Sequence, residues 1–276
     1  ILKVEGPTLS SKVNLDFKLS NSSVVLAGAT KGVGLELAKL LTKCEAKVGI
    51  IGRTRADGKN AIEEIKSESP NAEIYFFEGD LYSDEDRSKI FESTNDIFPQ
   101  GINHLVSFLG SGKTPFGTDV GINTWKEVFE KNFFSVINLV DTFLPLLKKS
   151  KENNSIIITS AIAGLERLSA PESYSCAKTA LSSYVPHLSK YLSKENIRVI
   201  GISPGNIYFD GGRWDEIIKE QGDKEISEKV LSQVSMKSFG LIEELAWVYL
   251  STISPRNSFM TGSNIIIDGQ QVNKIF

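Results

Sequence analysis

A tyrosine and a lysine four residues apart, Tyr174 and Lys178, form the pair in this sequence with the clearest chemical use. On a helix, side chains at positions i and i+4 share a face, so the phenol and the ammonium would point into the same space. A free phenol titrates near ~10, and a cation within roughly 4–6 Å lowers that pKa. The pair is therefore predicted to act as a general acid/base, which protonates a carbonyl oxygen while hydride arrives at the carbon. An ordinary solvated pair is the alternative.

A glycine-rich turn from Gly28 to Gly34 is the second chemical feature. The run before it, 23–27, is short, apolar and β-branched, as in a buried parallel strand, and the run after it places leucines on one helix face. Such a unit directs backbone N–H groups and a positive helix end at one point, which suits a pyrophosphate. Gly28 is assigned to the tight turn, Gly32 to close approach of the phosphates and Gly34 to helix–strand packing. A turn without a ligand is the alternative for this motif alone.

Two cations are predicted to select a phosphorylated dinucleotide. In dinucleotide folds the tip of the second strand meets the adenosine ribose, where an acid selects the 2′-hydroxyl and a cation accepts a 2′-phosphate. That tip carries Arg53 and no acid, and Lys31 lies within the glycine turn. The guanidinium offers a planar fork for phosphate oxygens, and the ammonium a point charge. The predicted cofactor is NADP(H), with Asp80 and the backbone of Leu81 beside the adenine.

Alternating strands and helices must hold these groups. The predicted strands are 23–27, 46–51, 73–78, 103–108, 155–160, 197–203 and 264–267. Helices are predicted over about 35–43, 57–68, 124–149, 173–192 and 243–251, and after an N-cap at Ser83. This order predicts an α/β fold with one doubly wound, seven-stranded parallel sheet and helices on both faces, in a single domain over residues 1–276. Ligands of such sheets bind beyond the carboxyl ends of the strands.

Length and composition are typical of a globular protein. The chain has 276 residues, of which 41% are hydrophobic and 24% charged, and its net charge is −3. This charge gives no sign of a nucleic-acid partner, and the apolar runs are too short to span a membrane. Two cysteines form no disulfide framework and two histidines no metal site. A cytoplasmic protein without a metal is therefore predicted.

The order and spacing of several motifs resemble the short-chain dehydrogenase/reductase family, from about Ser23 to Gly269. The matching pieces are Gly28-x-x-x-Gly32-x-Gly34, Asp80-Leu81, Asn132, Gly164, Tyr174-x-x-x-Lys178, Pro204-Gly205, Thr261-Gly262 and Asp268-Gly269. The resemblance implies a Rossmann-type subunit of a homodimer or homotetramer that moves hydride between a nicotinamide cofactor and a small-molecule carbonyl or alcohol. It implies that Tyr174 is the acid/base, that Lys178 holds the nicotinamide ribose and that Asn132 props a water in a proton relay.

Cofactor contacts are predicted from the motifs and the resemblance together. Lys31 and Arg53 match the basic pair of NADP-preferring members. The predicted cofactor-binding residues are Gly28, Thr30, Lys31, Gly32, Val33, Gly34, Arg53, Asp80, Leu81, Gly110, Tyr174, Lys178, Pro204, Gly205 and Ile207. The predicted function is that of an NADPH-dependent carbonyl reductase or alcohol dehydrogenase.

The main departure from the family is Ala161, thirteen residues before Tyr174, where the family carries a substrate-orienting serine. Ser160 is adjacent and is kept as a predicted catalytic residue. Neighbouring strand side chains face opposite sides, so Ser160 can substitute only if the strand end twists or bulges. Loss of one such donor typically costs on the order of 10²–10³ in rate. Ala161 and the altered stretch 107–109 keep two alternatives open: a catalytically impaired NADP-binding scaffold or regulatory protein, and an NADP-assisted epimerase or dehydratase.

Two segments flank this machinery. Residues 1–22 are predicted to form an N-terminal arm. Residues 206–240, after Pro204-Gly205, are predicted to form a substrate lid, hinged by glycines, in which Phe209 and Trp214 contact an apolar part of the substrate. A surface helix pair is the alternative for this second segment.

Overall fold

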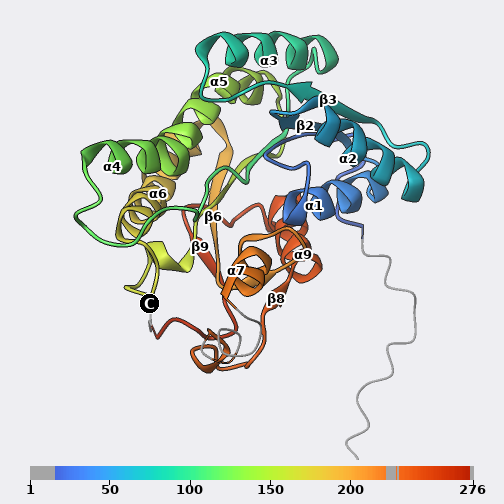
Figure 1. Cartoon of the computed structure of the whole chain (residues 1–276). Helices are drawn as coiled ribbons and strands as arrows, with labels where there is room; N and C mark the ends of the chain where they lie inside the picture. The colour runs from blue at the N-terminus through green and yellow to red at the C-terminus, as the bar shows by residue number, and fades with distance from the viewer. Residues whose placement is uncertain (1–15, 222–227, 229, 274–276) are drawn as a thin grey trace, which may run out of the picture.

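Seven parallel strands form the central sheet of the protein, whose computed structural model describes residues 16–221, 228 and 230–273 (Figure 1). The strand order is β3-β2-β1-β4-β5-β6-β9. The strands are β1 (Ser23–Ala27), β2 (Lys47–Gly52), β3 (Ile74–Glu78), β4 (His104–Ser107), β5 (Asn154–Thr159), β6 (Ile197–Pro204) and β9 (Asn264–Ile267). All seven predicted strands are confirmed within one residue at either end. The valine, isoleucine and leucine side chains of β1, β2, β4, β5 and β6 are almost fully buried, as expected for a sheet covered on both faces, whereas Ile266 of the edge strand β9 is 37% exposed.

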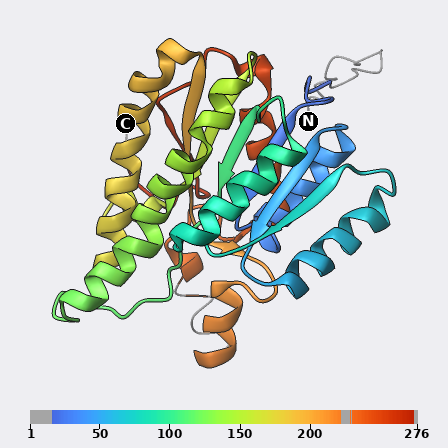
Figure 2. The same cartoon turned by 90° about the horizontal axis from the view of Figure 1, so that it is seen from above.

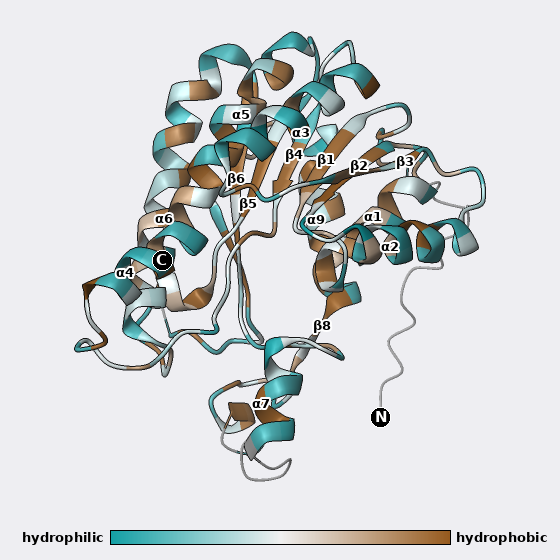
Figure 3. Ribbon diagram, turned by 45° about the horizontal axis from the view of Figure 1, so that its top comes forward, coloured by the Kyte–Doolittle hydropathy of each residue, from teal (hydrophilic) through white to brown (hydrophobic). Residues whose placement is uncertain are grey.

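Helices cover both faces of the sheet, as Figures 1 and 2 show. One face carries α1 (Gly32–Lys43), α2 (Arg55–Glu68) and α9 (Ile242–Ile253). The other carries α3 (Asp84–Ile97), α5 (Ser135–Lys149) and α6 (Glu172–Leu192). Each face has its own apolar core, and the apolar strands lie between amphipathic helices in Figure 3. The predicted doubly wound α/β fold, in a single domain, is confirmed.

The long helix predicted over 124–149 contains a wider turn that the sequence did not reveal. It consists of α4 (Ile122–Phe129), a π-helical turn (Glu130–Phe134) and α5. The residues at both junctions are right-handed helical, so the chain stays helical throughout. A π turn is rare and frequently marks a functional site, and this one contains Asn132.

The strand order reverses at β1, which lies between β2 and β4. Ala27 at the end of β1 pairs with Ser107 at the end of β4, so both strands reach the same edge of the sheet. Ligands of open α/β sheets bind in the crevice at such a reversal. The glycine turn after β1 and Gly110 after β4 therefore lie at the expected ligand edge.

The segment after β6 forms a small unit that stands apart from the sheet (Figure 3). It contains β7 (Ile207–Tyr208), α7 (Arg213–Gln221) and β8 (Gly240–Leu241), and β7 pairs with β8. This two-stranded pair was not predicted. Residues 222–227 and 229 of the predicted lid lie outside the described residues, as do residues 1–15 of the predicted arm.

Two structural absences apply to the described ranges 16–221, 228 and 230–273. None of their helices is long and apolar enough to cross a membrane. Their His, Cys, Asp and Glu side chains form no group of three or more that could hold a metal ion.

Candidate active site

The glycine turn has the backbone geometry that the motif requires. Gly28 and Gly32 have φ angles of +76° and +59°, in the left-handed region that favours glycine. A Cβ on Gly34 would lie 2.6 Å from the Cα of Ala29, so α1 packs tightly against the turn. Lys31, the N-cap of α1, makes no side-chain cap hydrogen bond, and the first turn contains no acid. The start of α1 therefore offers backbone N–H groups to an anion.

The two predicted phosphate-binding cations lie at neighbouring points of the sheet edge. A Cβ on Gly52, at the end of β2, would lie 2.8 Å from the Cγ2 of Thr30 in the glycine turn. This contact places the turn against the tip of β2. Lys31 and Arg53 follow these two residues in the chain, and both are exposed. Both cations are therefore available to a phosphate at this corner.

Asp80, the predicted adenine contact, is partly committed to its own turn. Its Oδ1 accepts a hydrogen bond from the backbone N–H of Tyr82 at 3.1 Å, and its own N–H donates to Asp86 Oδ2 at 2.8 Å. Leu81 is buried, and its carbonyl accepts from Arg87. Within the described part of the chain, Asp80 Oδ2 has no hydrogen-bond partner, so this oxygen is the one available to a ligand.

The predicted catalytic groups converge at the ends of β4 and β5. The ammonium of Lys178 lies 5.9 Å from the ring centroid of Tyr174 and donates to the carbonyl of Thr159 at 3.2 Å. A Cβ on Gly110 would lie 3.0 Å from Lys178 Nζ and 2.8 Å from Asn132 Oδ1. The structure therefore brings α6, the π turn and the loop after β4 to one point, where only a glycine fits.

The side chain of Asn132 braces the loop that follows β4. Its Oδ1 accepts from the N–H of Ser111 at 2.9 Å, and its Nδ2 donates to the carbonyls of Ser111 and Val128 at 3.2 and 3.0 Å. Asn132 is buried. Its carboxamide is therefore engaged at both ends, and its predicted part in a water relay stays a prediction.

The protonation of the catalytic pair differs from the expectation. Burial raises the pKa of Tyr174 to about 12 and lowers the pKa of Lys178 to about 8. Burial is the cause of the raised Tyr174 pKa, which is the opposite direction from the lowering that was predicted from Lys178. In the described part of the chain, the Tyr174 hydroxyl forms no hydrogen bond. The phenol is therefore protonated at neutral pH.

The two hydroxyl groups that precede Ala161, those of Thr159 and Ser160, have other partners. Ser160 Oγ donates to the backbone carbonyl of Lys178 at 3.2 Å and lies 2.8 Å from Ser182 Oγ. The Thr159 hydroxyl lies 2.6 Å from the hydroxyl of Tyr249. This arrangement weakens the prediction that Ser160 replaces the serine expected at position 161, because its hydroxyl is engaged with α6.

The remaining predicted cofactor residues lie at the end of β6 and in β7. Gly205 donates its N–H to the carbonyl of Ile267 at 2.8 Å, and a Cβ there would lie 2.8 Å from Asp268. Pro204 is the last residue of β6, and Ile207 lies in β7. The Pro204-Gly205 and Asp268-Gly269 motifs are therefore adjacent in space, because both follow neighbouring strands.

One contact at the site was missed by sequence reasoning. The ring of Phe209, expected beside a substrate, lies instead against Gly32 of the glycine turn. No local pattern reveals such a contact, because the two residues are far apart in the chain. The only sequence signal is the composition of the segment, in which an aromatic residue lies close to Gly211 and Gly212. This composition indicates a hinged lid and does not identify Gly32 as the contact.

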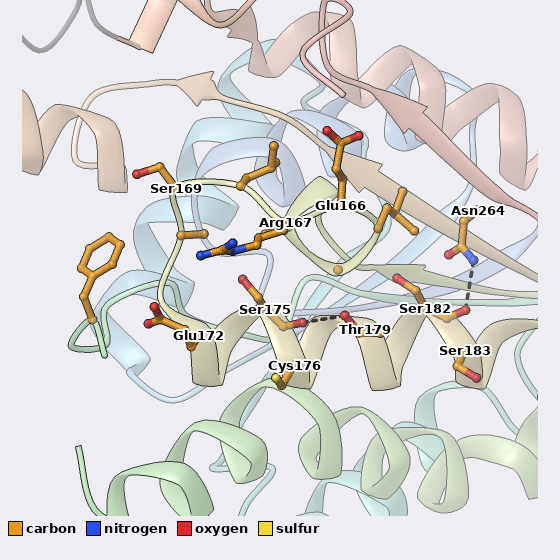
Figure 4. A pocket seen from close by; sticks show the side chains of 16 residues that line it. Glu166, Arg167, Ser169, Glu172, Ser175, Cys176, Thr179, Ser182, Ser183 and Asn264 are labelled. Carbon is orange, nitrogen blue, oxygen red and sulfur yellow. Dashed lines mark hydrogen bonds between the residues drawn. The ribbon is translucent and has the colours of Figure 1, made fainter. Parts of the chain in front are cut away.

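A cavity on another side of α6 lies away from these residues. It has a volume of about 770 Å³ and lies on the side of α6 that carries Ser175, Cys176 and Thr179 (Figure 4). Arg167 extends into it from the loop before α6. None of the predicted catalytic or cofactor-binding residues lines this cavity.

Comparisons with known proteins agree with the fold and with the motifs. The family model described as short chain dehydrogenase matches residues 22–213. The chain is 28% identical to the 3-oxoacyl-[acyl-carrier-protein] reductase FabG of Aquifex aeolicus, over 92% of this chain and 99% of that protein. It is 29% identical to the sorbose reductase SOU1 of Candida albicans, over 97% and 93%. The L-sorbose reductase of Gluconobacter frateurii, solved with NADPH and L-sorbose, superposes with a TM-score of 0.87 at 24% identity, over 95% and 100%. The matched residues include the glycine turn, Tyr174 and Lys178, and the chain belongs to the short-chain dehydrogenase family.

Proposed function

We propose that the protein is an NADPH-dependent reductase that transfers hydride to the carbonyl group of a small molecule. The observation that carries this proposal is the convergence of Lys178, Asn132 and Gly110 beside Tyr174. NADPH, when bound, supplies the hydride. The NADPH complex of the Gluconobacter frateurii reductase supports the choice of cofactor, as do the free helix end at Lys31 and the exposed Arg53.

Each residue has a defined part in this proposal. The Tyr174 hydroxyl, protonated at neutral pH, donates its proton to the carbonyl oxygen as the carbon is reduced. Lys178 binds the ribose next to the nicotinamide, and its hydrogen bond to the Thr159 carbonyl fixes its ammonium at the end of β5. Asn132 fixes the loop at Ser111 and so keeps Gly110 open to the cofactor. A protonated phenol favours reduction of a carbonyl over oxidation of an alcohol.

A polyhydroxylated ketone is the substrate class that we propose. Two of the similar proteins are named as sorbose reductases. A ketose also carries hydroxyl groups of its own, which can donate the hydrogen bond that a serine at position 161 would have given. We propose in addition a homodimer or homotetramer. The rings of Phe134 on the π turn and Tyr191 on α6 are exposed and would be suitable contacts between subunits.

Tyr174→Phe tests the proposed function. Wild-type protein should oxidise NADPH in the presence of L-sorbose or a related ketose, and the variant should retain NADPH binding while losing at least about 100-fold in rate. Tyr184→Phe is the matched control, since Tyr184 lies on the same helix and has no Lys four residues on. Equal turnover in both variants would exclude Tyr174 as the acid.

A catalytically impaired NADP-binding protein is the second candidate. It is favoured by Ala161 together with the engagement of both neighbouring hydroxyl groups. It predicts that wild type and Tyr174→Phe bind NADPH equally and that neither reduces any carbonyl of a broad panel of ketones, ketoses and 3-oxoacyl thioesters.

A further inference from the structure

The ring of Phe209 lies directly on the phosphate-binding turn. A Cβ built on Gly32 would lie 2.9 Å from Cζ of this ring and 3.0 Å from Cε2. A Cβ built on Gly212 would lie 2.7 Å from Cε1 of the same ring. The ring is thus held between two glycines, one from each half of the chain. At both places a side chain would displace it.

This position conflicts with an occupied cofactor site. Gly32 begins α1, where the N–H groups of the first helical turn have no partners within the helix. A diphosphate would have to approach the Cα of Gly32 closely to use them, which is the reason for a glycine at that position. The Phe209 ring takes up this space, so the ring and the diphosphate exclude each other.

The segment that carries Phe209 is built as a unit of its own. Asp215, which is 3% exposed, accepts hydrogen bonds from the Tyr208 hydroxyl at 3.2 Å, the Gly211 N–H at 2.8 Å and the Lys219 ammonium at 2.7 Å. All three donors lie within 208–219. The carboxylate therefore joins β7, the turn and α7 to one another. Among the described residues it forms no hydrogen bond with any other part of the chain.

The unit is anchored at β8, through the β7–β8 pairing and the contacts of Tyr208 and Trp214 with Phe239, whereas only weak contacts hold it over the glycine turn. Besides the ring on Gly32, Glu216 of α7 forms an ion pair with Lys113 of the loop after β4, at 3.6 Å and with both side chains exposed. Exposed ion pairs of this kind contribute little to stability. Gly211 has a φ of +75°, and a Cβ built on it would meet nothing within 4 Å, so the hydrogen bond of its N–H to Asp215 is the contact that a change in its conformation has to break. Displacement of the ring therefore breaks few contacts.

We propose that Phe209 is an autoinhibitory cover of the cofactor site, which the diphosphate of the dinucleotide displaces on binding. The inference rests on the proposed binding of NADPH and adds a closed, cofactor-free state to it. Binding must draw on the fraction of molecules in which the ring is away from Gly32, so the observed dissociation constant equals the intrinsic one divided by that fraction. Because Asp215 joins the turn at Gly211 to α7, departure of the ring shifts α7 relative to Phe239, which couples cofactor binding to the position of α7.

The test compares NADPH binding to wild type, Phe209→Ala and the control Phe259→Ala, whose ring is fully exposed. Adenosine 2′-monophosphate serves as the second probe, because it carries the 2′-phosphate and lacks the diphosphate. Phe209→Ala should bind NADPH roughly tenfold more tightly than wild type and associate faster, if the covered state outnumbers the open one about ten to one. Its affinity for adenosine 2′-monophosphate should be unchanged, and Phe259→Ala should match wild type with both probes.

Three other outcomes overturn the proposal. Unchanged NADPH affinity and association rate in Phe209→Ala would mean that the ring and the diphosphate do not compete. Weaker binding in a variant with a wild-type melting temperature would make the ring a wall of the occupied site. If neither adenosine 2′-monophosphate nor NADPH binds to wild type or to either variant, the proposed cofactor site is wrong. The proposal that Phe209 covers this site is then wrong as well.

Movement of the unit has its own readout in Trp214 of α7. Its ring lies 5.7 Å from that of Phe239, near β8. In a Trp125→Phe/Trp247→Phe background Trp214 is the only tryptophan of the chain. Its emission should change when NADP⁺ is added, and the same shift should be present without NADP⁺ after Phe209→Ala. A Trp214 spectrum that does not respond to saturating NADP⁺ would contradict displacement of the unit.

Discussion

Gly164 lies against the backbone of Lys178, on the helix that carries the proposed catalytic pair. A Cβ built on Gly164 would lie 2.5 Å from both the carbonyl carbon and the carbonyl oxygen of Lys178. The turn Ile162–Gly164 directly follows the end of β5, so this contact fixes how far α6 stands from the sheet. The distance between Lys178 Nζ and the Thr159 carbonyl depends on it. This contact explains why a glycine is needed ten residues before Tyr174.

Gly164→Ala should therefore damage both activity and stability. The added methyl group has no space between the turn and α6, and overpacking of this kind costs about 1–3 kcal/mol in the free energy of unfolding. A shift of α6 also moves Tyr174 and Lys178, and we expect NADPH-dependent reduction to fall at least about tenfold. Gly112→Ala is the control, because a Cβ on Gly112 meets nothing within 4 Å. Urea unfolding and steady-state kinetics measure the two effects. If Gly164→Ala had the same unfolding free energy and the same rate of reduction as wild type, the contact between Gly164 and Lys178 would not be rigid.

Ala161→Ser should raise the rate of carbonyl reduction. Ala161 is extended and follows β5, and neither adjacent hydroxyl is free to replace a serine there. One added hydrogen-bond donor of this kind is worth up to about 10²–10³ in rate. Ala163→Ser, two residues on, is the matched control and should leave the rate unchanged. If Ala161→Ser is as slow as wild type with every carbonyl tested, a missing donor does not limit this enzyme.

Arg53→Asp should change the choice of cofactor. The substitution removes a charged donor and places a carboxylate at the tip of β2, where it repels a 2′-phosphate and accepts from a 2′-hydroxyl. We expect the dissociation constant of NADPH to rise about 100-fold and that of NADH to change little, since a hydrogen bond to a charged group contributes roughly 1.5–3 kcal/mol. Arg55→Asp serves as the control, as Arg55 is exposed at the start of α2. Equal losses for both dinucleotides would count against Arg53 as the phosphate ligand.

Most of the fold could be predicted because its signals are local. Short β-branched runs such as 155–160 are typical of buried strands, and the alternation of strands with helices indicates one parallel sheet. The π turn around Asn132 could not be predicted, since the residues that form it are compatible with an ordinary helix. The β7–β8 pair escaped for a similar reason: two residues carry no periodicity.

The candidate site was also predicted only in those features that depend on local sequence. The spacing of Tyr174 and Lys178 placed both on one face of α6, and the glycine turn was found from its three glycines. Side-chain direction and burial are properties of the whole fold, and here the sequence misled. The Ser160 hydroxyl turned out to be engaged with Ser182, and burial raised the Tyr174 pKa that the lysine was expected to lower.

His104 should make the protein less stable in mild acid. It is fully buried in β4, where its Nδ1 lies 2.8 Å from Ser155 Oγ, and its Nε2 has no hydrogen-bond partner among the described residues. Burial, with a smaller effect of the Arg198 charge, lowers the pKa of this imidazole to about 3 from an ordinary value of 6.5. Between these two values the unfolded chain binds a proton that the folded chain does not, so stability falls as the pH falls below 6.5.

The slope is large enough to measure. Each pH unit costs up to about 1.4 kcal/mol, so His104 alone should remove about 2 kcal/mol of unfolding free energy between pH 6.5 and pH 5. His104→Gln lacks the titrating group. Between pH 6.5 and pH 5 its unfolding free energy should therefore fall by about 2 kcal/mol less than that of wild type, although the variant is less stable than wild type at pH 7.5. His187→Gln removes the other histidine, from an exposed position on α6, and serves as the comparison variant. Because wild type and His104→Gln share every other titrating group, the difference between their slopes isolates His104. Identical slopes in these two proteins would mean that water reaches this imidazole in the folded protein.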